Sequence, residues 1–196
     1  MSAPQTRTDL SAILTERRRR LDAALASLDA NREDAIAVID AIVSTVQGGG
    51  LVATCGNGGS AAEALHLSEE LIGRYRADRA PLRSMCLGAD PTAITCIAND
   101  FGFEEIFARQ AEALLGPTDA LVVFSTSGNS PNLLKALEVA GRCGATRVGF
   151  LGGDGGQARN LCDVSIVIQG EDSAAIQEVH QVVMHACCEP FEPDCI

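Results

Sequence analysis

Residues 51–62 are Leu-Val-Ala-Thr-Cys-Gly-Asn-Gly-Gly-Ser-Ala-Ala, and this stretch decides the fold. Its first five residues predict a buried strand, and a helical pattern follows the glycines as far as Arg74. The glycines allow a ligand to approach the backbone closely, and Ser60 is expected to cap the helix. The turn is not G-x-G-x-x-G, because Ala61 occupies the third glycine position, and it lacks the lysine of a P-loop. Nucleotide binding is therefore disfavoured.

The same succession of a short apolar run and a helical stretch recurs along the chain. Strands are predicted at Leu51–Cys55, Ser84–Leu87, Ala120–Phe124, Arg147–Leu151 and Val164–Ile168. Helices are predicted at Gly59–Arg74, Pro91–Asn99, Glu104–Leu115, Ser130–Cys143, Gly156–Leu161 and Ser173–Glu189. Nearly continuous apolar strands that alternate with helices indicate a parallel sheet covered on both faces. We predict a three-layer α/β fold with a central parallel sheet of about five strands.

The first 50 residues follow a different pattern. Apolar residues at helical spacing predict helices at Ser11–Leu28 and Asn31–Val46, with Asn31 as an N-cap and the glycines at 48–50 as the stop. We therefore expect an N-terminal helical hairpin at 1–50, added to a second region at 51–196.

Charge and cysteine content limit the classes of partner. The formal net charge of −11 argues against nucleic-acid binding, and Arg17–Arg20 are interpreted as a solvated helix face. Neither a membrane span nor a secretion signal is apparent. The eight cysteines include no C-x-x-C pair, which favours reduced thiols and a cytoplasmic location. Cys187, Cys188 and Cys195 could oxidise if they are exposed.

The turn at Ser125–Ser130 reads Ser-Thr-Ser-Gly-Asn-Ser and lies between a predicted strand and a predicted helix. Hydroxyl groups and free backbone N–H groups at a helix N-terminus form a site for an anion. The simpler interpretation is a capped turn with spare serines. Four hydroxyls in six residues exceed what capping needs, so we favour phosphate.

The three histidines of the chain supply a second group of candidates. His66 and Glu70 lie four residues apart on one helix face, with Glu69 close by, and this pair is either a surface salt bridge or part of a site. His180 and His185 both lie in the last predicted helix. Metal binding or proton transfer explains this distribution better than chance.

These motifs, in this order, resemble the phosphoheptose isomerases of the sugar isomerase (SIS) superfamily. The resemblance runs from about Leu51 to Glu189, and more weakly through the N-terminal helices. It rests on the glycine turn at 55–62, His66 with Glu69-Glu70, Gly73-Arg74, Ala98–Phe103, Ser125–Ser130, Asp154-Gly155-Gly156 and Ile176–His180.

The resemblance implies an SIS domain at 51–196 and a helical hairpin at 1–50 that serves oligomerisation. It also implies an aldose–ketose isomerase that converts sedoheptulose 7-phosphate to D-glycero-D-manno-heptose 7-phosphate through an enediol, in heptose biosynthesis. A carboxylate and an imidazole suit the proton transfers of such a reaction, and a Lewis acid would polarise the carbonyl. Members of the family are homotetramers with sites at subunit interfaces.

Matched motif by motif, the resemblance also assigns residues. Substrate contacts fall on Asn57, Gly58, Gly59, Ser60, Glu70, Asn99, Asp100, Ser125, Thr126, Ser127, Ser130 and Gln177. One Zn²⁺ per subunit falls on His66, Glu70, Gln177 and His185. Glu70 and His185 match the acid/base pair, and Asn99 and Asp100 are expected in a neighbouring loop.

Two features of the last helix stand apart. Gln177 and His185 are about 12 Å apart along a helix axis, so both side chains must reach toward one ion. His180 could replace His185 by position, but the motif match puts His185 in the site and leaves His180 a structural role. Ala174-Ala175 stands where the family usually has an arginine, which bears on the exact substrate.

Two other functions remain open. Related SIS proteins are non-catalytic regulators, one of which binds the bacterial replication initiator, and in that relative the phosphate turn and the last histidine are altered. Ser127 and His185 are both present here, which favours an enzyme. An isomerase for another sugar phosphate is the second alternative.

Overall fold

A five-stranded parallel sheet forms the centre of the molecule. The computed structural model describes residues 7–193. The strands lie in the order β2-β1-β3-β4-β5, and every neighbouring pair is parallel. They span β1 (Val52–Gly56), β2 (Ser84–Cys86), β3 (Ala120–Ser125), β4 (Thr146–Gly152) and β5 (Val164–Ile168). The predicted three-layer α/β fold and its strand count are confirmed.

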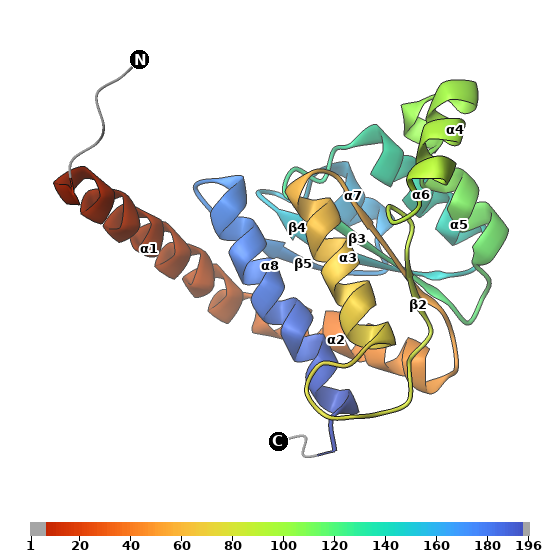
Figure 1. Ribbon diagram of the computed structural model, residues 1–196, viewed down its shortest axis with the longest axis horizontal. Helices are drawn as coiled ribbons and strands as arrows, with labels where there is room; N and C mark the ends of the chain where they lie inside the picture. The colour runs from red at the N-terminus through yellow and green to blue at the C-terminus, as the bar shows by residue number, and fades with distance from the viewer. Residues whose placement is uncertain (1–6, 194–196) are drawn as a thin grey trace.

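Helices α2 (Arg32–Gln47), α3 (Gly59–Ile72) and α8 (Ser173–Cys188) cover one face of the sheet (Figure 1). The core on this face is built from alternate residues of the strands, because successive side chains of a strand point to opposite faces. Phe124 and Phe150 stack here with ring centroids 4.5 Å apart. Ile42, Leu67 and Val179 bring the three helices onto them.

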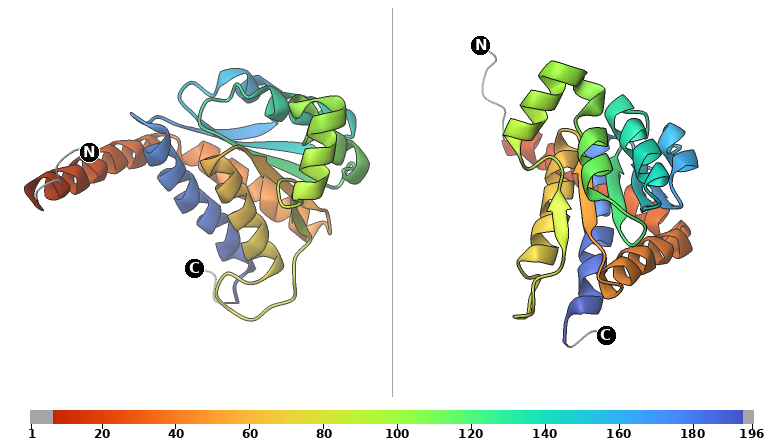
Figure 2. Two further views of the ribbon diagram at one scale, coloured as in Figure 1. Left: turned by 45° about the horizontal axis from the view of Figure 1, so that its top comes forward. Right: turned by 90° about the vertical axis from the view of Figure 1, so that its right-hand side faces the viewer.

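Helices α5 (Ala108–Leu114), α6 (Pro131–Arg142) and α7 (Gly156–Leu161) cover the opposite face (Figure 2). Leu121, Val123 and Leu151 supply the strand side of this second core. Helix α4 (Pro91–Phe101) lies beside this layer and has no buried residue. A short 3₁₀ turn, η1 (Phe103–Glu105), connects it to α5, and a second, η2 (Glu189–Phe191), follows α8.

Helix α1 (Arg7–Ala30) leads away from the body, whereas α2 packs against the sheet (Figure 1). Only Asn31 separates the two helices. The predicted Asn31 position is confirmed, but its side chain donates to Ser27 O at 2.7 Å and does not cap α2. The stop at residues 48–50 is confirmed by the end of α2 at Gln47.

Two local predictions are wrong. The single helix expected at 104–115 is broken after η1, because Ile106, Phe107 and Ala108 are all buried and three consecutive residues cannot share one helix face. Ser60 does not cap α3, because the helix begins at Gly59 after Gly58, whose φ of 56° suits glycine.

The remaining sequence expectations concern the surface and the thiols. Arg17–Arg20 all form ion pairs with acidic side chains, so the basic run is not a free positive patch. Cys187 and Cys188 are buried, and burial raises the pKa of the Cys188 thiol to about 12, which opposes oxidation. Cys195 lies outside the described residues. Within residues 7–193, the helices are too short or too polar to cross a membrane.

Candidate functional site

Two turns meet at the carboxyl edge of the sheet, where parallel α/β proteins bind ligands. The glycine turn follows β1, the serine turn follows β3, and these strands are neighbours. Asn57 of the first turn and Asn132 of α6 exchange hydrogen bonds of 2.9 and 2.8 Å through their side-chain amides. A pocket of about 220 Å³ lies between the turns. It is lined by Asn57, Ser60, Phe124, Ser125, Thr126, Ser127, Ser130, Leu133, Ser173 and Gln177.

The serine turn divides its hydroxyls between two tasks. Oγ of Ser125 accepts from Gly128 N at 3.0 Å, and Oγ of Ser127 accepts from Asn129 N at 3.3 Å, so these two shape the turn. Gly128 has φ 63°, and a Cβ there would lie 1.9 Å from Gly155 O. Ser130 occupies the N-cap position of α6 without a capping hydrogen bond from its side chain. The α6 N-terminus is therefore directed at the pocket with hydroxyls around it.

The start of α8 closes the other side of this pocket. Oγ1 of Thr126 donates to Oγ of Ser173 at 3.2 Å, and Nε2 of Gln177 lies 3.5 Å from Oγ of Ser60. A Cβ on Gly59 would lie 2.6 Å from Nε2 of Gln177, so only glycine permits this approach. Sequence reasoning missed Ser173, although a serine that opens the last predicted helix is a visible signal.

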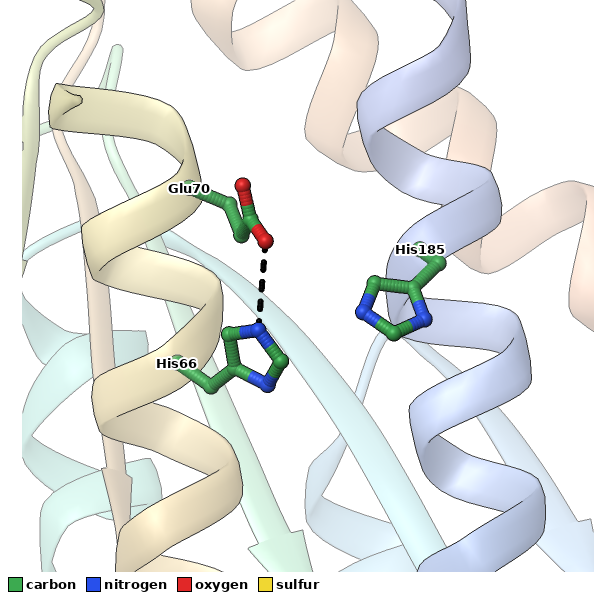
Figure 3. A group of neighbouring side chains, drawn as sticks. All are labelled: His66, Glu70 and His185. Atoms are coloured by element: carbon green, nitrogen blue, oxygen red, sulfur yellow. Dashed lines mark hydrogen bonds and ion pairs between the residues drawn. The ribbon is translucent and has the colours of Figure 1, made fainter. Parts of the chain in front are cut away.

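Figure 3 shows His66 and Glu70 on α3 facing His185 on α8. One ligand atom from each of the three lies within 4.8 Å of the others, and all three side chains are half-buried. Nε2 of His66 is 3.2 Å from Oε1 of Glu70. The prediction that these residues come together is confirmed, and their mixture of imidazole and carboxylate suits Zn²⁺.

Two further side chains hold the histidines and were not identified from the sequence. Nδ1 of His66 is 2.8 Å from Oε1 of Gln181, which lies one turn after Gln177 on α8. Tyr75 stacks on His185 with ring centroids 5.7 Å apart, and its hydroxyl donates to Glu189 at 3.3 Å. The structure thus turns Gln181 toward His66, whereas Gln177 lies against Gly59.

The other predicted residues are placed as follows. Asn99 and Asp100 lie on α4 and not in a loop; both are exposed, and neither lines the pocket of this chain. His180 is fully buried, consistent with a structural role. Ala175, at the position where an arginine was expected, is also buried. The guanidinium groups beside this stretch belong instead to Arg17 and Arg20, which bind Asp172.

Comparison with known proteins places this fold and site in a class. The model of the SIS domain matches residues 18–152, and the chain belongs to the SIS domain family. It is 46% identical over 151 residues to a phosphoheptose isomerase of Trichlorobacter lovleyi, covering 77% of each chain. It is also 41% identical over 166 residues to a phosphoheptose isomerase of Helicobacter pylori, covering 85% of this chain and 86% of the other. Within the SIS family, the chain is a member of the phosphoheptose isomerase group.

Solved structures agree with this assignment. A phosphoheptose isomerase from Francisella tularensis superposes with a TM-score of 0.86 at 32% identity, covering 92% of this chain and 96% of the other. The phosphoheptose isomerase of Neisseria gonorrhoeae gives a TM-score of 0.83, also at 32% identity, over 94% and 97% of the two chains.

Proposed function

We propose that this chain converts sedoheptulose 7-phosphate to D-glycero-D-manno-heptose 7-phosphate, an aldose–ketose isomerisation in heptose biosynthesis. One observation carries the proposal: Glu70, His66 and His185 converge from α3 and α8, and earlier residues of the same two helices line a pocket that carries a serine-rich helix N-terminus. The first group supplies proton-transfer chemistry, and the pocket suits a phosphate. The similarity to phosphoheptose isomerases supports a heptose phosphate as the substrate.

In this proposal the two parts of the site divide the substrate between them. Thr126, Ser130 and the α6 N-terminus bind the phosphate, with the turn held in shape by Ser125 and Ser127. Asn57, Gly58, Gly59 and Gln177 contact the sugar. Glu70 carries the proton between C1 and C2, and His185 donates to and accepts from the substrate oxygens as the enediol forms and collapses.

The same residues would hold one Zn²⁺. His66, Glu70 and His185 fit this group, because three ligand atoms of suitable types already lie within 4.8 Å of one another. We include Gln177 as a fourth ligand, which requires its side chain to turn from Gly59 toward His66. When bound, the ion would polarise the substrate carbonyl and stabilise negative charge on its oxygen.

We further propose a cytoplasmic homotetramer with sites completed at subunit interfaces. Residues 1–50 would serve oligomerisation in this arrangement. Asn99 and Asp100 support the proposal, since both are exposed and distant enough from the pocket not to line it, and so could serve a neighbouring subunit. Buried free thiols such as Cys55 support a reducing compartment.

The substitution Glu70→Gln tests the isomerase. We expect kcat to fall by at least about 100-fold, because an amide cannot act as the base, whereas the fold and the oligomer are retained. Conversion of sedoheptulose 7-phosphate to the aldose phosphate is the measurement. Glu69→Gln is the matched control, since Glu69 is the adjacent, exposed carboxylate. Near-normal turnover by Glu70→Gln would remove the proposed base.

A further inference from the structure

Glu63 of α3 and His180 of α8 form a buried polar contact beneath the site. Glu63 is 3% exposed and His180 is fully buried, and Nδ1 of His180 lies 3.4 Å from Oε1 of Glu63. On its other side, Nε2 of His180 is 3.0 Å from Leu151 O, in β4. The rings of Phe124 and Phe150 meet the imidazole edge-on. One imidazole therefore connects α3, α8 and the sheet.

The chemistry of these atoms makes the contact more than incidental packing. A carbonyl oxygen only accepts, so Nε2 of His180 carries a proton and Nδ1 alone faces the carboxylate. Among residues 7–193, both oxygens of Glu63 and Nδ1 of His180 lack a hydrogen-bond partner, and their 3.4 Å contact is an ion-pair distance. Unpaired buried polar groups are costly, so the stability of this arrangement depends on how closely α3 and α8 hold Glu63 against Nδ1 of His180.

We propose that the Glu63–His180 pair is a positioning element that sets the spacing between α3 and α8, and with it the relative placement of His66, Glu70 and His185. Glu63 lies three residues before His66 and seven residues before Glu70, so the three side chains share one face of α3. His180 is five residues before His185 on α8. The proposal rests on the function proposed above, because it takes His66, Glu70 and His185 as the working groups.

Glu63→Leu tests this role through two properties of the protein. We expect its zinc affinity, measured by competition with a chromophoric chelator, to fall by about 10- to 100-fold. We also expect kcat to fall by as much as about 100-fold while KM changes little, since the reacting groups are displaced but the serine turn is untouched. Glu63→Gln keeps the size, and its amide N–H can donate a hydrogen bond to Nδ1, so it should retain most of both properties.

Leu137→Ala is the matched control for a general loss of stability. Leu137 is fully buried on α6, in the core on the opposite face of the sheet. The Leu137→Ala protein should be less stable than the wild type and should keep the wild-type zinc affinity.

If Glu63→Leu does not fold, Glu63→Leu/His180→Phe removes both polar groups, leaves no unpaired charge, and should show the same weakened zinc binding. Zinc affinity and kcat unchanged in a folded Glu63 variant would overturn the proposal.

Failure of the proposed function would be separately visible. If the wild-type protein binds no zinc, or does not turn over the sugar phosphate, the proposed function is contradicted. The role of the Glu63–His180 pair is then tested by a third measurement. NMR signals of the His66 and His185 rings need neither metal nor turnover. Glu63→Leu should shift both signals, and Leu137→Ala should shift neither. Unshifted rings in Glu63→Leu would overturn the inference whatever the reaction is.

Discussion

The contact between His66 and Gln181 decides which nitrogen of the imidazole is available. With the amide oxygen of Gln181 2.8 Å from Nδ1, that nitrogen carries the proton. Nε2 then presents a lone pair toward Glu70, 3.2 Å away. Two acceptors that face each other repel unless a cation or a proton lies between them, so in the proposed zinc site Gln181 would orient His66 as a ligand.

Gln181→Leu should weaken zinc binding by about 10- to 100-fold, because the imidazole loses the partner that fixes its tautomer and orientation. Zinc affinity by competition titration is the measurement. Gln157→Leu on α7 is the control, since Gln157 is exposed and lies on the opposite face of the sheet. Equal affinities for the two variants would contradict a role for Gln181.

The N-terminus of α8 is fixed by an element distant in sequence. Asp172 accepts from Ala175 N at 2.8 Å as the N-cap of α8. Arg17 and Arg20 of α1 bind the same carboxylate at 2.7 and 2.8 Å. The Ala175 N–H and the Arg20 and Arg17 guanidinium groups together hold the pKa of Asp172 well below its ordinary value of 3.8.

This depressed pKa predicts how stability changes in acid. Because the folded pKa of Asp172 is lower than the unfolded one, its stabilisation is present above pH 3.8 and is lost as pH falls below that value. Glu16 behaves alike, since hydrogen bonds from Arg19 and Arg20 lower its pKa to about 2. Asp172→Ala should therefore lower Tm at pH 7 and flatten the decline of Tm between pH 4 and about pH 2.

Thermal unfolding followed by circular dichroism across that range gives the comparison. The control is Asp78→Ala, which removes an exposed carboxylate from the loop between α3 and β2. It should leave Tm and its pH profile close to those of the wild type. A profile for Asp172→Ala that parallels the wild type would contradict the coupling between α1 and α8.

For the molecule as a whole, the projecting helix α1 is the feature that a single chain does not explain. Leu10, Ile13 and Leu14 are exposed on it, Leu14 to 71%. Figure 2 shows that the part of α1 farthest from α2 lies clear of the sheet and its covering helices. Apolar side chains on an extended helix are a natural contact for further copies of the chain.

Leu14→Asp should dissociate the proposed tetramer into smaller species, because a charge would be buried where apolar side chains pack. Light scattering after size-exclusion chromatography measures the mass. Leu114→Asp, at the end of α5, is the control, since Leu114 is 42% exposed on another part of the surface. An unchanged mass for Leu14→Asp would exclude this part of α1 from the interface.

The sequence alone predicted the parallel sheet, its five strands and both turns. These features depend on local signals, namely apolar runs and glycine at turns, which act within one segment. The proposed metal ligands His66, Glu70, Gln177 and His185 were implied by the resemblance to the phosphoheptose isomerases, because i,i+4 spacing left His66 and Glu70 open as a salt bridge. Even so, the segment at 104–115 was predicted as one helix, because periodicity does not show that three consecutive residues will be buried.

Only the tertiary structure decided how α3 and α8 face each other. The rotation of two packed helices brings Gln181, and not Gln177, to His66, and it places Glu63 against His180. It also brings Arg17 and Arg20 to Asp172, the N-cap residue of α8, which lies about 150 residues further along the chain. Such contacts are fixed by the packing of side chains distant in sequence, whereas the pattern of a single helix specifies its buried face and not its partner.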